Sequence, residues 1–229
     1  MCVETLSAVA RAYHFHASLC NTVSSFVIKQ QNLSSEAKNI RLVLEGNKGY
    51  VLKGSFIRDS LSASFINRNK SNILGYFTEW NAFRGIAMAI CEGISHTPDF
   101  KDYLKRILGE DKQKHFEYII RFIRNVLSHN IESEINLIAD NFEGTKKQFI
   151  RSVDQSGVAR FDFNYNRDFP AKTGFPEDYG FYIEIRFCDL KAGNKFTNVV
   201  SEWHLFMIME LCYNLVNYYR KVSGCYSTP

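Results

Sequence analysis

The chain lacks the features that mark several common classes of protein. It contains no uninterrupted apolar run long enough to cross a bilayer, so we expect no membrane-spanning helix. Charged residues and two histidines interrupt the apolar residues near the N-terminus, so we expect no secretory signal peptide. No internal repeat, low-complexity tract or linker is visible. These absences favour a single domain over residues 1–229.

Spacings that commonly hold metals, nucleotides or catalytic nucleophiles are also missing. The six cysteines include no CxxC pair and no histidine lies in an HExxH sequence, so we predict no metal site and no cofactor. The Gly-Asn-Lys-Gly segment at residues 46–49 lacks the Gly-Lys-Ser/Thr ending of a P-loop. Neither paired catalytic carboxylates nor a Ser-His-Asp arrangement can be recognised. The scattered cysteines favour free thiols and a cytoplasmic location.

The composition provides material for a large core and permits an anionic partner. Hydrophobic residues make up 45% of the chain, which is enough for a well-packed interior. The net charge of +4 is mildly basic. Such a balance is compatible with binding RNA but does not require it.

Helical periodicity dominates most of the chain. It predicts helices over residues 5–30, 34–44, 55–66, 73–94, 99–108, 112–139 and 197–222. The stretch 40–52 is ambiguous, because its Gly-Asn-Lys-Gly segment suits both a helix end and a hairpin turn. The last helix is predicted to bury a stripe made of Val200, Trp203, Phe206, Met207, Leu211, Leu215 and Tyr218.

A strand-rich segment is predicted at about residues 146–190. Apolar and polar residues alternate over 160–165 and again over 181–188, which is typical of strands, and residues 147–153 are a candidate third strand. Residues 168–179 contain two of the four prolines and are predicted to form a loop. We expect the strand aromatics to pack against helices rather than to stack on bases. The predicted fold is therefore mainly α, a helical bundle with a small antiparallel β insertion before the last helix.

The hexapeptide Arg-Asn-Val-Leu-Ser-His at residues 124–129 carries the clearest chemical signal. It lies on the polar face of the helix predicted over 112–139. At about 100° per residue, Asn125 and His129 lie on one face, one turn apart. Arg124 is offset from His129 by roughly 140°, so one straight helix does not direct both side chains at one small target. Two copies related by a two-fold axis would supply the missing group.

These residue types suit the cleavage of RNA without a metal. The 2′-hydroxyl attacks the adjacent phosphate, so a group must remove its proton, another must protonate the leaving oxygen, and the extra negative charge must be stabilised. Histidine can transfer protons near neutral pH. Arginine is always charged and binds phosphate oxygens through two N–H groups.

The pattern resembles the RNxxxH motif of the HEPN superfamily, whose helical members include many metal-independent ribonucleases. The resemblance implies a homodimer with a composite cleft, in which His129 transfers protons, Arg124 holds the scissile phosphate and Asn125 orients the pair. The product would carry a 2′,3′-cyclic phosphate. It also implies a toxin or anti-phage role, with an antitoxin or another regulatory protein as a partner. A branch of these toxins is modified at a tyrosine two residues after the histidine; Ile131 occupies that position here, so we expect no control by that route.

Two alternatives remain open at this stage. One is a non-catalytic HEPN-like module that binds RNA, a nucleotide or a partner protein. The other is a helical interaction protein in which the hexapeptide is accidental. Candidate RNA-binding residues outside the motif are Arg121, Arg68 and Lys70, but such charges more often belong to solvated helix ends and loops. The same holds for the basic cluster formed by Lys101, Lys105, Arg106, Lys112 and Lys114.

Overall fold

A computed structural model describes residues 40–45, 48–52, 73–129, 135–171 and 174–223. Contacts divide the chain into two compact units, one of residues 1–13 with 80–229 and the other of residues 14–79. The predicted helices over 5–30 and 55–66 lie outside the described residues. The prediction of a single domain stays a prediction.

In the smaller unit, two strands form an antiparallel hairpin. Strand β1 (Ile40–Glu45) pairs with β2 (Lys48–Leu52), and Ile40 lies opposite Leu52. Of the two structures that suited residues 40–52, the hairpin is the one observed. The helix predicted over 34–44 is therefore wrong from Ile40 onward, because this β-branched segment pairs with a second strand across the turn.

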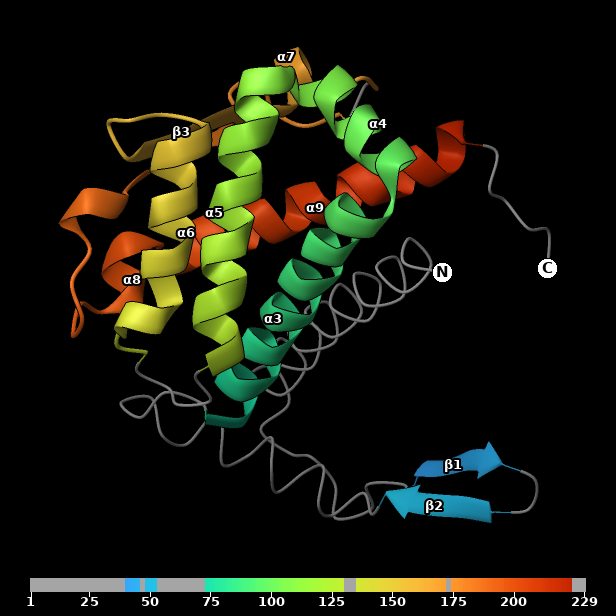
Figure 1. Ribbon diagram of the computed structural model, residues 1–229. Coiled ribbons are helices and arrows are strands. Elements are labelled where there is room, and N and C mark those ends of the chain that lie inside the picture. The colour runs from blue at the N-terminus through green and yellow to red at the C-terminus, as the bar shows by residue number, and fades with distance from the viewer. Residues whose placement is uncertain (1–39, 46–47, 53–72, 130–134, 172–173, 224–229) are drawn as a thin grey trace. The chain divides into compact units, whose positions relative to one another are not determined.

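In the larger unit, three long helices precede the sheet. Helix α3 (Ile73–His96) is followed by α4 (Pro98–Leu108) and α5 (Glu110–His129), and α4 and α5 lie side by side (Figure 1). Pro98 starts α4 at a position where its missing N–H costs nothing, and Gly109 ends it with a positive φ of 79°. The predicted helices over 73–94 and 99–108 are thereby confirmed.

The helix predicted over residues 112–139 is confirmed up to His129, but the prediction is wrong for residues 135–138, which are not helical. Helix α5 ends at His129, and α6 (Ala139–Ser152) begins ten residues later. Between them, the backbone at Ile135 and Leu137 pairs with residues 193–196, with hydrogen bonds of 2.8 Å from Leu137 N–H to the Asn194 carbonyl and from Phe196 N–H to the Ile135 carbonyl. Ile135 and Leu137 are buried, so they continue the apolar pattern of α5 in the sequence, although their backbone is extended and not helical.

The candidate third strand at residues 147–153 is also wrong. These residues belong mainly to α6, where Phe142, Thr145 and Phe149 are buried at helical spacing. Helix α6 packs along α5 in antiparallel orientation (Figure 1). The segment 147–153 taken alone is too short to show a helical period. The period becomes visible only when the buried residues Phe142 and Thr145, earlier in α6, are included.

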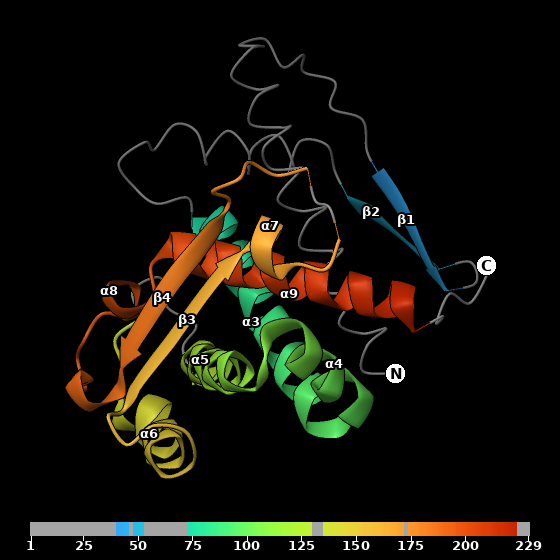
Figure 2. The same ribbon diagram turned by 90° about the horizontal axis from the view of Figure 1, so that it is seen from above.

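The two other predicted strands are present and form a two-stranded antiparallel sheet. Strand β3 (Val158–Asn164) pairs with β4 (Gly180–Arg186), so that Phe161 lies opposite Ile183 and Phe163 opposite Phe181. These side chains are buried, whereas the alternate residues Arg160 and Glu184 form an ion pair on the other face. Figure 2 shows β3 next to α5 and β4 next to α9. The expectation that the strand aromatics pack against helices is confirmed, because the ring of Phe116 in α5 lies 5.0 Å from that of Phe161.

Short helices follow each of the two strands of this sheet. They are α7 (Tyr165–Asp168), the 3₁₀ helix η1 (Phe187–Asp189) and α8 (Phe196–Val199), and α9 (Glu202–Val222) closes the fold. The helix predicted over 197–222 is broken at Ser201, whose hydroxyl caps α9 by accepting a hydrogen bond of 3.2 Å from the His204 N–H. The structure is thus mainly helical with a small antiparallel sheet before the last helix, as predicted.

The buried face of α9 differs from the predicted stripe at one large residue. Val200, Met207, Leu211 and Leu215 are buried, and Phe206 and Tyr218 are half-buried. The prediction that Trp203 is buried is wrong, because its side chain is 56% exposed. Its ring stacks on that of Phe206 at a centroid distance of 5.8 Å. The covered face begins at Leu205, which lies about 200° around the helix from Trp203. Among the described helices, none combines the length and apolarity needed to span a membrane.

Candidate functional site

The predicted motif occupies the last two turns of α5. Ile123, Val126 and Leu127 are buried, whereas Arg124 and Asn125 are half-buried and His129 is exposed. The assignment of the motif to the polar side of a helix is therefore confirmed. Helix α5 is held in place by its apolar face, and the motif residues are left for polar contacts.

Arg124 and Asn125 make contacts with different helices. The Asn125 side-chain amide donates a hydrogen bond of 3.0 Å to the Thr145 hydroxyl on α6. The Arg124 side chain instead lies beside the Cys91 thiol on α3, and both residues line one pocket. Adjacent residues on a helix point about 100° apart, so Arg124 can face α3 while Asn125 faces α6. His129 lies one turn beyond Asn125, on the α6 side.

A partly open pocket of about 270 Å³ lies beside Arg124. Helix α3 provides the remaining lining residues, which are Met88, Cys91, Glu92, Ser95 and His96. Its chemistry is mixed, with a guanidinium, an imidazole, a hydroxyl, a carboxylate and a thioether facing the same space. Within one protomer, the histidine that shares a pocket with Arg124 is therefore His96.

The Cys91 thiol does not neutralise Arg124. Burial raises the pKa of this thiol from an ordinary 9.0 to about 11, although the nearby Arg124 guanidinium acts in the opposite direction. Cys91 consequently stays protonated at neutral pH and is a poor nucleophile. The neighbouring buried thiol of Cys212 on α9 also has a raised pKa, because it is fully desolvated.

The end of α5 is fixed to α3 by a second arginine. The Arg84 Nε atom donates a hydrogen bond of 2.5 Å to the Leu127 carbonyl, which belongs to the last turn of α5. Carbonyls in this turn have no partner inside the helix, and a cation stabilises the negative end of the helix dipole. Arg84 therefore holds the last turn of α5, which carries the exposed His129, against α3.

Arg121, predicted to contact RNA, makes a structural ion pair. Its Nη2 atom lies 2.5 Å from the carboxylate of Glu117, which is buried and also accepts a hydrogen bond of 2.9 Å from Gln113. A buried carboxylate needs such partners, so Arg121 stabilises the packing of α5. Of the other predicted residues, Arg68 and Lys70 lie outside the described residues, as does Ile131.

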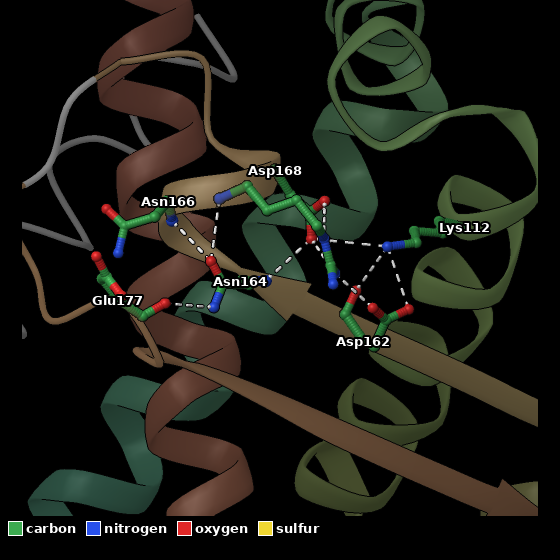
Figure 3. Close-up of polar contacts among 7 residues, drawn as sticks. Lys112, Asp162, Asn164, Asn166, Asp168 and Glu177 are labelled. Carbon is green, nitrogen blue, oxygen red and sulfur yellow. Dashed lines mark hydrogen bonds and ion pairs between the residues drawn. The ribbon is translucent and has the colours of Figure 1, made fainter.

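The predicted basic cluster is largely paired with carboxylates. Lys114 pairs with Glu110 at 2.9 Å, and Lys112 lies 3.1 Å from Asp162 and 3.6 Å from Asp168. Figure 3 shows Lys112 directed between the two aspartates at the end of β3. The pairs of Lys112 connect α5 to β3 and to the residues that follow it, whereas the Lys114–Glu110 pair lies within α5.

The same group of charges fixes α7 and the loop after it. Asn164 caps α7 by accepting hydrogen bonds from the N–H groups of Asn166 and Arg167, and its amide donates one of 2.9 Å to the Glu177 carbonyl (Figure 3). Burial by itself raises the pKa of Asp168, but hydrogen bonds from Arg167 and from the Asn164 N–H outweigh it, and that pKa falls below the ordinary 3.8.

We expect Asp168→Asn to lower the free energy of unfolding at pH 7 by about 1–2 kcal/mol, because hydrogen-bonded charge pairs are lost. A lowered folded-state pKa stabilises the fold above the ordinary pKa, and this contribution is lost as the pH falls through the ordinary value toward the folded one. The difference from the wild type should therefore shrink below about pH 4. Urea unfolding at pH 7 and pH 3 measures it. Asp189→Asn, at an exposed position, is the control, and an equal loss in both variants would contradict the assignment.

Sequence reasoning missed Glu92, Ser95 and His96 as site residues. The helix predicted over 73–94 stopped before His96, which was assigned to the turn preceding Pro98. Helix α3 continues to His96, so Glu92 and His96 lie one turn apart on one face. The signal available in the sequence was this i, i+4 pair of a carboxylate and an imidazole near a helix end.

Comparison with protein-family models, with curated proteins and with solved structures finds no match for the chain. Within the described part of the chain, no group of three or more His, Cys, Asp or Glu side chains is placed to hold a metal ion. The candidate site therefore rests on the contacts of α5 and α3.

Proposed function

We propose that the chain is a metal-independent endoribonuclease of the HEPN type, with an active site completed by a second copy. The observation that carries the proposal is the position of the hexapeptide. Arg124 lines a pocket, and His129 is exposed at the end of the same helix. Both side chains remain accessible to a substrate while α5 itself is held by buried neighbours.

The divergence of Arg124 and His129 favours a site shared by two protomers. Arg124 contacts α3, and Asn125, one turn before His129, contacts α6. A phosphate bound by Arg124 of one protomer would meet His129 of the partner subunit if a two-fold axis passes near the end of α5. A homodimer is therefore part of the proposal.

The proposed reaction needs no group beyond the chain, RNA and water. His129 removes the 2′-hydroxyl proton, the 2′-oxygen forms a bond to phosphorus, and the bond to the 5′-oxygen breaks. The leaving 5′-oxygen takes up a proton from water, and the imidazolium of His129 returns its proton to the hydroxide that is formed. Arg124 stabilises the charge on the phosphorane oxygens. Asn125, whose NH₂ group is engaged by Thr145, has its carbonyl oxygen available to orient the imidazole.

Cleavage in excess chelator tests the proposal. We expect the purified wild-type protein to cut single-stranded or structured RNA and to leave 2′,3′-cyclic phosphate ends, which mass spectrometry of the fragments identifies. The cyclic end follows from attack by the 2′-oxygen and distinguishes this route from hydrolysis by water. Fragments that carry only 5′-phosphate and 3′-hydroxyl ends would contradict the mechanism.

The biological role proposed from the resemblance is that of a toxin or an anti-phage effector acting on cellular RNA. An antitoxin or another regulatory protein would then control the activity. RNA binding without cleavage would instead support the non-catalytic module.

A further inference from the structure

We propose that Arg124 and His96 of a single protomer form a phosphate-binding pocket for one nucleotide unit. The pocket is inferred from its own lining residues, and only the identification of its ligand as RNA rests on the proposed function. It assigns a role to a histidine outside the hexapeptide. It also separates binding of the phosphate, by Arg124 and His96, from proton transfer, by His129.

The size of the pocket fits one small ligand. Its volume of about 270 Å³ is near the lower limit of small-molecule sites, which is about 300 Å³. A phosphate with part of its nucleoside is of this order, whereas a longer segment of RNA has to leave through the open side. Met88, which is 41% exposed, offers an apolar contact at the rim.

The charge on Arg124 is available to the ligand. Among the described residues no carboxylate forms an ion pair with Arg124, and the neighbouring Cys91 is a neutral thiol. Arg121, three residues earlier, is by contrast held by the buried Glu117. A half-buried guanidinium that no carboxylate of the described residues pairs with favours an anion, and phosphate matches its planar set of N–H donors.

His96 and Ser95 supply the remaining donors. Both are exposed at the last turn of α3 and line the same pocket as Arg124. Glu92, one turn before His96, can accept a hydrogen bond from one ring nitrogen and leave the other directed at the phosphate. The Glu92 carboxylate also repels anions, so we expect a phosphate to bind less tightly than in a purely cationic pocket.

The arrangement divides the work of the proposed dimer. Arg124 and His96 hold the scissile phosphate in one protomer, and the partner's His129 transfers the proton. His96 is then a phosphate-binding residue, and its loss should raise KM more than it lowers kcat. A residue that serves only to fold the pocket would not produce this split.

Titration of the intact protein tests the pocket. The probes are inorganic phosphate, uridine 3′-monophosphate and a short 2′-O-methylated RNA that cannot be cut, and the readout is the NMR shift of the histidine ring protons. We expect saturable binding that Arg124→Ala and His96→Gln each weaken by at least about tenfold. Ser128→Ala should bind within about twofold of the wild type, as should Arg186→Ala, a charge-matched control on the exposed face of β4.

Unchanged affinity in both Arg124→Ala and His96→Gln would overturn the inference, as would an equal loss in Arg186→Ala. Binding of the nucleotide but not of the RNA would assign the pocket to free nucleotides, and the reverse to RNA; both outcomes support a phosphate site. RNA cleavage that is insensitive to His96→Gln would refute this inference and leave the proposed function intact. Phosphate binding without any cleavage would keep the pocket and refute the ribonuclease.

Discussion

His129→Ala is expected to lower the rate of RNA cleavage by at least about 10²-fold, because general acid–base catalysis contributes about 10²–10⁴-fold and alanine cannot transfer a proton. His129 is exposed at the end of α5, so the free energy of unfolding should change by less than about 0.5 kcal/mol. RNA affinity should stay nearly unchanged. Cleavage assays under single-turnover conditions, together with thermal unfolding, measure these effects.

Two matched variants make this result specific. Ser128→Ala removes a polar group from the neighbouring exposed position and should cleave as fast as the wild type. His129→Gln preserves hydrogen bonding without proton transfer and should be as inactive as His129→Ala. Cleavage by His129→Ala at the wild-type rate would show that the catalytic assignment is wrong.

Mixing two inactive variants tests whether the site is shared. A dimer of one Arg124→Ala chain and one His129→Ala chain still contains one intact arginine and one intact histidine, on different protomers. Partial recovery of cleavage on mixing is expected if the partner's His129 acts on a phosphate held by Arg124. A monomer in sedimentation experiments, or no recovery in a demonstrably mixed dimer, would rule out the composite site.

Phe122→Ala is expected to lower the free energy of unfolding by about 3–5 kcal/mol, the usual cost of removing a buried aromatic ring. Phe122 is 0% exposed and lies two residues before Arg124. Its ring contacts Phe187 at 5.8 Å and Phe196 at 5.9 Å, both from segments that follow the sheet. A cavity here would loosen the contact between α5 and these segments. Urea unfolding monitored by circular dichroism measures the loss.

The exposed Trp203 supplies the contrasting substitution. Trp203→Ala removes a larger ring, but this ring is mostly exposed and stacks on Phe206, so we expect a loss below about 1.5 kcal/mol. Phe122→Leu fills most of the cavity and should cost less than Phe122→Ala. Equal losses for Phe122→Ala and Trp203→Ala would contradict the burial of α5 described above.

The sequence by itself determined the elements whose pattern is local. Period-two alternation predicted β3 and β4, because one face of a strand is buried along its whole length. Helical spacing predicted the apolar face of α5 and therefore the polar placement of Arg124 and His129. Pro98 and Gly109 marked the ends of α4, since each suits a backbone position that other residues adopt less readily.

Only the tertiary structure decided which neighbour covers each face. The helical period predicts that Arg124 lies on the polar side of α5. Its contact with Cys91, by contrast, joins residues 33 positions apart and depends on how α3 packs against α5. The same dependence explains the exposed Trp203 and the extended backbone at Ile135, whose surroundings come from distant segments. Burial energy is set by whatever atoms surround a side chain, and a local pattern carries no information about the identity of those atoms.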